Sequence, residues 1–282
     1  MRLMPLREAL AAHVADGDCV ALEGFTHLIP FAAGHELIRQ GRRNLHLVRM
    51  TPDLIYDQLI GMGCARRLTF SWGGNPGIGS LHRLRDAVEH GWPQALELDE
   101  HSHAGMAAAY CAGASRLPFG MLRGYLDNDL DKANPRIGRI ECPFTGERLA
   151  AVPAINPDVT ILHAQCADRE GNVAIRGIVG AQREAALAAG ALVVTVEEIV
   201  ERLEPAMNGI VLPHWTVDAV VHCPGGAYPS YTHGHYSRDN SFYQRWDAIS
   251  RDRDTFNAWM REHVLETNDH AGFLASLRAE AA

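Results

Sequence analysis

The nine residues C-V-A-L-E-G-F-T-H, numbered 19–27, contain the pattern on which the fold prediction rests. A short apolar run ends at Glu23 and Gly24, as a buried strand does when it enters a turn. A helix is expected next, over 31–40, and Gly41 stops it as a C-cap glycine would. The same order then repeats, with strands expected at 44–49, 68–72, 95–99, 159–165, 192–196 and 217–222. It predicts an α/β protein with an open, largely parallel sheet flanked by helices.

Length and composition are consistent with one large globular unit. The chain has 282 residues, of which 47% are hydrophobic, and this length suits a single hydrophobic core. We expect one domain over 1–282, with a C-terminal helical layer from about 241–282. The formal net charge is −8, from 34 acidic and 26 basic residues. Nucleic acids and anionic membranes select basic surfaces, so neither is an expected partner.

Sequence signals for export or membrane insertion are not found. No apolar run approaches the roughly 20 residues that a membrane helix needs. The first residues carry Glu8, Asp16 and Asp18 and are typical of an amphipathic helix over 3–14, not of a signal peptide. The 6 cysteines are scattered without a C-x-x-C pair, which favours reduced thiols. The expected location is the cytoplasm.

Two glycine-containing turns follow predicted strands, where ligands of open parallel sheets bind. In the first, Gly24 would let backbone N–H groups approach a ligand and Thr26 would add a hydroxyl next to Phe25. An ordinary strand-end turn explains the same residues. The second turn, S-W-G-G-N-P-G-I-G at 71–79, lacks the spacing of known phosphate-binding and dinucleotide-binding fingerprints. It is either a contact for a phosphate or pantetheine group or a tight turn; its candidate residues are Ser71, Gly73 and Gly74.

A dense group of titratable side chains, D-E-H-S-H at 99–103, precedes an alanine-rich helix. Two carboxylates and two imidazoles at a strand end are typical of acid–base or anion-stabilising sites. The structural alternative is that Ser102 or His103 caps the helix. The H-x-H spacing, also present at 233–235, lacks the further ligands that zinc requires, so no metal is expected.

The segment 116–145 is polar and irregular, with several Asp and Asn residues. A surface loop is the preferred interpretation, and a substrate lid is the alternative. Residues 168–171 then turn into a short hairpin strand that ends at 175.

Several longer motifs resemble the A subunit of the glutaconate CoA-transferase type, within the family I CoA-transferases. The match begins with V-A-L-E-G-F-T at 20–26 and I-R-Q-G at 38–41 and extends over about 6–272. Its most specific part is P-D-V, H-A-Q and D-x-x-G-N between 157 and 172. The other matching segments are C-P-F-T-G-E at 142–147, A-V-P at 151–153, V-D-A-V-V at 217–221 and P-G-G-A at 224–227.

This resemblance implies half of an enzyme. Family members move CoA from an acyl-CoA to a carboxylate, and a glutamate of the B subunit, in a Ser-Glu-Asn-Gly motif, attacks the thioester. No such motif occurs in this chain. The resemblance therefore implies a B-subunit partner, in a heterotetramer of the A2B2 kind, with CoA as substrate and no permanently bound cofactor.

Three candidate catalytic residues depart from or add to the family pattern. Glu23 replaces the first glycine of a Gly-Gly-Phe-Thr turn; it either contacts the acyl group, acts as a base or forms a buried pair. His103 lies fifteen residues before Pro118, where the family has a glutamine that donates to the thioester oxygen. It is expected to be an oxyanion donor or a proton shuttle. Glu100 corresponds in region to a carboxylate of a hydrolase branch.

These departures leave three functional hypotheses. The first is one subunit of a CoA-transferase for a small acyl or dicarboxylic acyl-CoA, of the glutaconate or 3-oxoacid type. The second is one subunit of an acyl-CoA hydrolase or decarboxylase on the same scaffold. The third is a non-catalytic assembly subunit that binds acyl-CoA. A partner that carries the glutamate would favour transfer, and a partner that lacks it would favour hydrolysis or decarboxylation. A complex without turnover, although Gly24 and His103 are intact, would indicate the third hypothesis.

Overall fold

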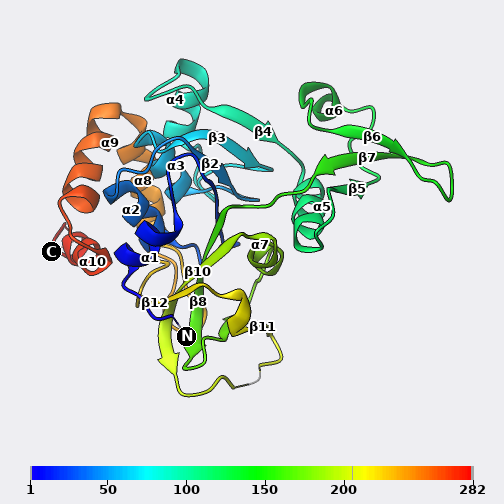
Figure 1. The fold of residues 1–282 in the computed structure, drawn as a ribbon. Helices are drawn as coiled ribbons and strands as arrows, with labels where there is room; N and C mark the ends of the chain where they lie inside the picture. Colours follow the sequence, from blue (N-terminus) through cyan, green and yellow to red (C-terminus); the bar gives the residue numbers. More distant parts are fainter. Residues whose placement is uncertain (1, 205, 281–282) are drawn as a thin grey trace.

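A computed structural model describes residues 2–204 and 206–280, and these form a large mixed sheet with helices on both faces (Figure 1). The parallel part of the sheet has the order β12-β10-β8-β1-β2-β3-β4. Its strands are β1 (Cys19–Glu23), β2 (Leu45–Val48), β3 (Ala65–Phe70), β4 (Glu97–Glu100), β8 (Val159–Asp168), β10 (Ala191–Val200) and β12 (Ala219–His222). The predicted α/β class with an open, largely parallel sheet is confirmed.

A short antiparallel extension continues the sheet beside the end of β8. Here β9 (Val173–Arg176) pairs with β8 and with β11 (Gly209–Leu212). The hairpin expected after residue 168 is therefore confirmed, whereas β11 was not predicted. Its four residues leave Val211 exposed and follow no buried run that sequence reasoning could recognise.

Two groups of helices cover the sheet. On one face α5 (His103–Ala114) packs against α7 (Gln182–Ala188), and α7 rests on β1 and β8. The other face is covered by α2 (Phe31–Arg39), α3 (Leu54–Gly61) and α4 (His82–His90). The C-terminal helices α8 (Asn240–Arg251), α9 (Arg253–Met260) and α10 (His270–Glu280) pack against this group. A π-helical turn, Arg261–Leu265, links α9 towards α10. No helix within the described ranges is long and apolar enough to span a bilayer.

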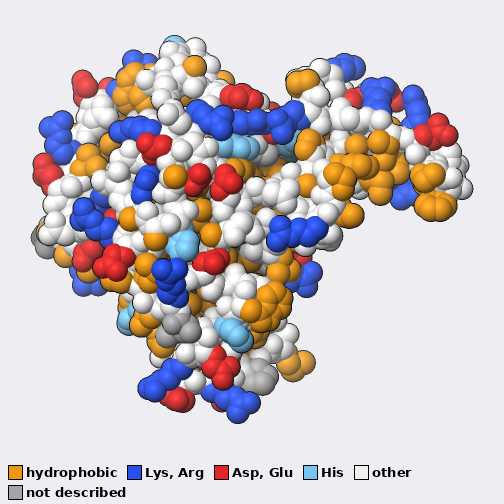
Figure 2. All heavy atoms as spheres, viewed as in Figure 1, with side chains coloured by type: hydrophobic (Ala, Val, Ile, Leu, Met, Phe, Trp, Pro, Cys, Tyr) orange, Lys and Arg blue, Asp and Glu red, His pale blue; other side chains and the backbone are white. Residues whose placement is uncertain are grey.

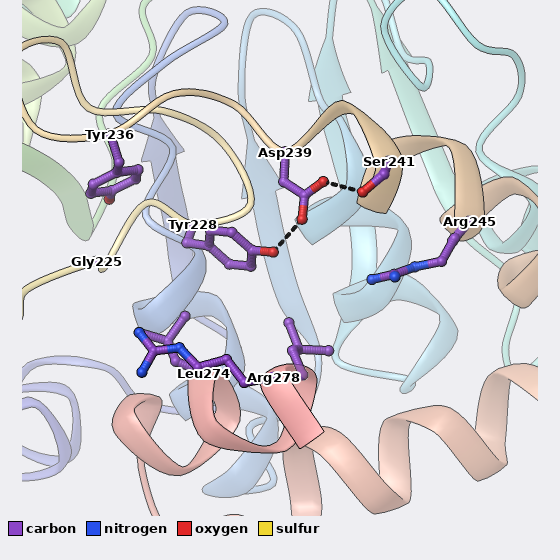
Figure 3. A pocket seen from close by; sticks show the side chains of 9 residues that line it. Gly225, Tyr228, Tyr236, Asp239, Ser241, Arg245, Leu274 and Arg278 are labelled. Carbon is purple, nitrogen blue, oxygen red and sulfur yellow. Dashed lines mark hydrogen bonds between the residues drawn. The ribbon is translucent and has the colours of Figure 1, made fainter. Parts of the chain in front are cut away.

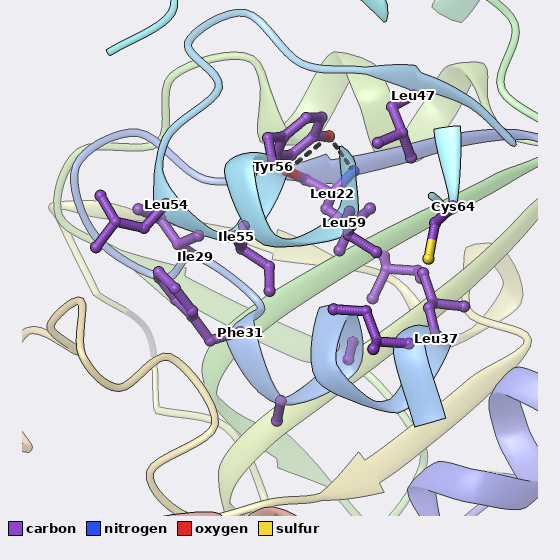
Figure 4. Close-up of a cluster of buried hydrophobic side chains, with 14 of the residues drawn as sticks. Leu22, Ile29, Phe31, Leu37, Leu47, Leu54, Ile55, Tyr56, Leu59 and Cys64 are labelled. Atoms are coloured by element: carbon purple, nitrogen blue, oxygen red, sulfur yellow. Dashed lines mark hydrogen bonds between the residues drawn. The ribbon is translucent and has the colours of Figure 1, made fainter. Parts of the chain in front are cut away.

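The main core lies between the sheet and the α2–α3 pair (Figure 4). Both faces of the parallel strands are covered, which explains why β8 is buried at all of its positions. Tyr56 joins α3 to the sheet by hydrogen bonds. Its hydroxyl donates to the Val48 carbonyl of β2 at 2.8 Å and accepts from the Leu22 N–H of β1 at 3.1 Å.

The N-terminal residues cover an edge of the sheet. The helix expected over 3–14 is shorter, α1 (Leu6–His13), and Leu3 instead pairs in parallel with Val220 of β12. Val220 N–H donates to the Arg2 carbonyl, and its carbonyl accepts from Met4 N–H, both at 3.0 Å. Both backbone groups of this edge residue are thereby satisfied.

The prediction of an irregular segment at 116–145 is wrong for much of its length. This region contains a three-stranded antiparallel sheet of β5 (Phe119–Leu122), β6 (Gly138–Glu141) and β7 (Arg148–Pro153). The short helix α6 (Asp129–Ala133) lies between β5 and β6 in the sequence. We call residues 119–153 the lobe, which projects from the main sheet (Figure 1). Its strands are short and partly exposed, so their hydrophobic pattern is weak. Figure 2 shows hydrophobic side chains gathered on the lobe; Phe119, Met121 and Phe144 are exposed there.

Glu197 of β10 organises a buried polar network. Its Oε1 lies 2.7 Å from His163 Nε2 and accepts from the Tyr236 and Thr232 hydroxyls, while Oε2 accepts from Gly225 N–H at 2.7 Å. Burial alone would raise the pKa of Glu197, but the hydrogen bonds and charge of His163, with the Gly225 and Tyr236 donors, lower it to about 2. The network ties β8 and β10 to the segment that precedes α8.

This network predicts an acid-sensitive contribution to stability. The folded-state pKa is below the unfolded value, so the stabilisation is present above about pH 4.5 and is lost as the pH falls towards about 2; its size is about 3 kcal/mol. The free energy of unfolding, measured by urea titration, should therefore fall less at low pH in Glu197→Gln than in the unchanged protein. Glu198 is a neighbouring, exposed residue, and the control variant Glu198→Gln should show the same fall as the unchanged protein. Equal acid dependence in the two variants would contradict this assignment.

Candidate active site

The turn after β1 has an unusual backbone. Thr26 and Leu28 have positive φ angles, 64° and 54°, in the left-handed region that non-glycine residues rarely occupy. A Cβ on Gly24 would lie 2.6 Å from the Leu28 carbonyl oxygen, so the glycine is required because the turn folds back on itself. Gly24 therefore allows the turn to form, and the next two residues, Phe25 and Thr26, line a cavity.

This cavity, of about 200 Å³, lies beyond the carboxyl ends of the parallel strands. The turn after β1, the loops after β2 and β3, the start of α5 and the region around the start of α8 all contribute to it. Its lining residues are Phe25, Thr26, Ile29, Arg49, Thr51, Asp53, Trp72, Pro76, His103, Arg238 and Tyr243. The turns singled out in the sequence after the first, third and fourth strands therefore surround one cavity.

The glycine-rich loop contributes side chains to this cavity through Trp72 and Pro76, not through its glycines. A Cβ on Gly74 would lie 2.7 Å from the Trp72 ring, and one on Gly73 would lie 3.3 Å from Leu84 Cδ2. These two candidate residues therefore make room for neighbouring side chains, and neither lines the cavity. The tight-turn interpretation accounts for both of them.

Ser71 fixes the hydrogen positions on His103. The Ser71 hydroxyl donates to the Met50 carbonyl at 2.6 Å, and its oxygen lies 3.3 Å from His103 Nδ1. Because the single hydroxyl proton is directed at Met50, which can only accept, we infer that His103 Nδ1 carries a hydrogen and donates to Ser71. In the neutral ring Nε2 then has a lone pair. His103 can donate from Nε2 only as the imidazolium.

The titratable group at 99–103 is divided between two sides of the strand end. Asp99 and His101 are buried away from the cavity, where Asp99 accepts from Arg67 at 2.7 Å and pairs with His101 Nε2 at 3.1 Å. Burial would raise the pKa of Asp99, but the His101 contact and further donors hold it below its usual range. Ser102 caps α5 by accepting from Gly105 N–H at 3.1 Å. The Glu100 side chain is exposed and does not line the cavity.

Glu23 is buried, with 2% of its surface exposed, and does not line the cavity. Its Oε1 accepts from Met50 N–H at 2.9 Å and from the Tyr110 hydroxyl at 2.8 Å. Burial raises the pKa of Glu23, and the nearby Arg49 charge with these donors opposes the rise. Of the alternatives open in the sequence, this geometry favours the structural one, with a backbone N–H and a tyrosine hydroxyl as the partners.

Sequence reasoning missed the charged residues of the cavity. Arg49 donates to Asp53 at 2.9 Å and to the Gly24 carbonyl at 2.9 Å. The four-residue spacing of Arg49 and Asp53 after a buried strand was a usable signal. No sequence signal indicated Arg238, because it lies in a polar segment far along the chain from the first strands.

A second cavity, of about 400 Å³, lies between α10, the start of α8 and the preceding segment (Figure 3). Asp239 accepts there from the Tyr228 and Ser241 hydroxyls, and Arg245 and Arg278 extend from the two helices (Figure 3). None of the sequence-predicted site residues lines it.

An open parallel sheet with a small cavity at its carboxyl edge is the arrangement of ligand-binding α/β enzymes. The particular family follows from comparison with known proteins: the family model described as Coenzyme A transferase matches residues 3–223. The chain belongs to this family, and it is a CoA-transferase subunit of the A type. The resemblance to the A subunit of glutaconate CoA-transferase is thereby confirmed.

Individual relatives cover nearly the whole chain. It is 66% identical over 275 residues to the A subunit of the 3-oxoadipate CoA-transferase of Pseudomonas knackmussii, covering 98% of both chains. It is 34% identical to the A subunit of the glutaconate CoA-transferase of Acidaminococcus fermentans, covering 99% of this chain and 92% of the relative. The crystal structure of that organism's glutaconate CoA-transferase superposes with a TM-score of 0.91, at 32% identity, over 99% of this chain and 94% of the other. The decarboxylase AibA/AibB superposes at 0.79, with 31% identity, over 92% and 98%.

The placement of Glu23 predicts a stability effect without a specificity effect. Glu23→Ala leaves the Tyr110 hydroxyl and the Met50 N–H without their acceptor, which should lower the free energy of unfolding by about 3 kcal/mol. The ratio of kcat/KM between two acyl groups should not change. Glu89→Ala, on the exposed surface of α4, is the control and should change stability by less than about 0.5 kcal/mol. A shifted acyl preference at unchanged stability would place Glu23 in the cavity instead.

Proposed function

We propose that this chain is the A subunit of an enzyme that moves CoA between an acyl-CoA and a small carboxylic acid of the 3-oxoadipate or glutaconate type. The observation that carries the proposal is the 66% identity, along almost the full chain, to the A subunit of a 3-oxoadipate CoA-transferase. The cavity supports it, since Arg49, Arg238 and His103 are polar groups set among apolar walls, as a short carboxylate-bearing acyl group requires. CoA is a substrate in this proposal, and no resident cofactor takes part.

In this proposal the nucleophile belongs to a partner subunit. Among the described residues, Asp53 is the carboxylate that lines the cavity, and it is buried and bound to Arg49, so it is not free to attack a thioester. Neither Glu23 nor Glu100 reaches the lining. We therefore assign the attacking glutamate to a B subunit that completes the site, in an A2B2 assembly.

The reaction proceeds by acyl exchange on that glutamate. Its carboxylate attacks the thioester carbonyl, the tetrahedral oxyanion collapses, and CoA leaves as a thiolate. The thiolate attacks the glutamyl carbonyl of the resulting anhydride, which releases the first acid and leaves a glutamyl-CoA thioester. The acceptor acid then repeats the steps in reverse order. Each step develops an oxyanion that needs hydrogen-bond donors.

In this proposal the present chain supplies the wall of the site that faces the glutamate of the B subunit. In the same proposal His103, which begins α5 and lines the cavity, donates from Nε2 to the thioester oxygen when its ring is doubly protonated. Thr26 and Phe25 contribute a hydroxyl and an apolar surface beside it. Ser71 acts through His103 by holding its ring, and Gly24, Gly73 and Gly74 shape the turns that carry these side chains.

Reconstitution tests the proposal. The isolated chain should show no CoA transfer, and adding a B subunit should restore it. Incubating the complex with acyl-CoA should leave a CoA thioester on the B subunit, detectable by mass spectrometry of the intact chains. Acid release without an acceptor would indicate a hydrolase, and CO₂ release would indicate a decarboxylase. Transfer by this chain alone would refute the placement of the nucleophile.

His103 should be important for turnover in that complex. Removing an oxyanion donor by His103→Ala should lower kcat about a hundredfold. His103→Gln should recover most of the rate, because an amide N–H donates without first binding a proton. His90→Ala, at the exposed end of α4, is the control and should leave kcat unchanged. An unchanged rate in His103→Ala would remove this residue from the site, and failure of glutamine to recover the rate would favour proton transfer.

A further inference from the structure

Arg238 has a fixed position in the cavity but no anionic partner. Its Nη2 donates to the Pro76 carbonyl at 2.9 Å, and its guanidinium lies 3.8 Å from the centre of the Tyr243 ring. The Nε atom is buried and has no hydrogen-bond partner. No carboxylate within residues 2–204 and 206–280 forms an ion pair with Arg238 at 4.0 Å or less. A positioned guanidinium with an unused donor is ready to bind an anion.

Two guanidinium groups and one carboxylate line the cavity. Arg49 and Asp53 form an ion pair at 2.9 Å, and Arg238 is the second guanidinium. Arg49 Nε and Asp53 Oδ2 are also buried without hydrogen-bond partners. Three unpartnered buried atoms, Arg49 Nε, Asp53 Oδ2 and Arg238 Nε, thus belong to residues that line this cavity. The local charge contrasts with the net charge of −8 of the chain.

We propose that Arg238 binds the distal carboxylate of a dicarboxylic acyl group, the one not linked to CoA, and thereby selects dicarboxylic over monocarboxylic substrates. This inference rests on the proposed transferase function. Phe25, Ile29 and Trp72 supply apolar walls for the methylene groups between the two carboxyl ends. His103 lines the same cavity and marks the end where the thioester reacts.

The glycine-rich loop acquires a role in this proposal. Its Pro76 carbonyl holds the Arg238 guanidinium, and Asn75 Nδ2 donates to the Tyr243 carbonyl at 2.7 Å. The loop is thus joined both to the arginine and to the residue on which it stacks. We regard Pro76 and Tyr243 as positioning groups for Arg238.

A phosphate of CoA is the other source of negative charge that Arg238 could bind. The lining argues for the carboxylate, because Phe25, Ile29 and Trp72 give Arg238 apolar neighbours that suit a short acyl chain. The two sources are separable by experiment, since a phosphate contact would affect every CoA ester equally, whatever its acyl group.

The test compares 3-oxoadipate with 3-oxohexanoate, which has a methyl group in place of the distal carboxylate. In the complex with the B subunit, Arg238→Met should lower kcat/KM for 3-oxoadipate about a hundredfold and leave that for 3-oxohexanoate within about threefold. Arg238→Lys should recover part of the selectivity, because it keeps the charge without the planar, stacked group. Arg245→Met, on α8 but facing the second cavity, should retain the full selectivity.

Other outcomes overturn the inference. An equal loss for both acids would indicate a structural role, and an unchanged ratio would remove Arg238 from the acyl site. A rise in KM for every CoA ester alike would indicate phosphate binding. Calorimetric titration of the complex with free 3-oxoadipate separates the anchor from the transferase function. If the complex binds the acid but does not transfer CoA, and Arg238→Met abolishes binding, the anchor stands and the proposed function fails.

Discussion

The buried carboxylate of Glu23 is the junction on which the geometry of the site depends. It joins the end of β1 to the loop after β2 through Met50 N–H and to α5 through Tyr110. The carbonyl of the same Met50 accepts from Ser71, which orients His103. A single buried carboxyl group thus connects three strand ends and the helix that carries the candidate oxyanion donor. Burying such a polar group costs free energy, and its hydrogen bonds offset that cost.

The parallel sheet was predictable because its strands are buried on both faces and read as apolar runs ending in glycine turns. The lobe was not, since its strands of four to six residues are partly exposed and carry no strong period. The same distinction applies to the site. Phe25, Thr26 and His103 follow predicted strands and could be named as candidates from the sequence, whereas Arg238 reaches the cavity through tertiary packing on Tyr243. Residues that the fold brings from a distant polar segment leave no local signal.

Proximity in sequence misled the assignment of the titratable cluster. Asp99, His101 and His103 lie within five residues of the chain, yet the first two lie on one side of the junction between β4 and α5 and the third lines the cavity. The hydrogen-bonded neighbours of His103 are instead Ser71 and, through Ser71, Met50, both on other loops. Hydrogen-bond direction then carries information that composition cannot, because the Ser71 proton determines which imidazole nitrogen is free.

The pairing of Leu3 with Val220 has a practical consequence for handling this protein. An unpaired strand edge is a template for association between chains, and the N-terminal residues occupy that edge beside β12. Trimming the first four residues, or stiffening them with a fused tag, would return the Val220 amide and carbonyl to solvent. Material prepared in that way would be prone to edge-to-edge aggregation even with its core and cavity intact.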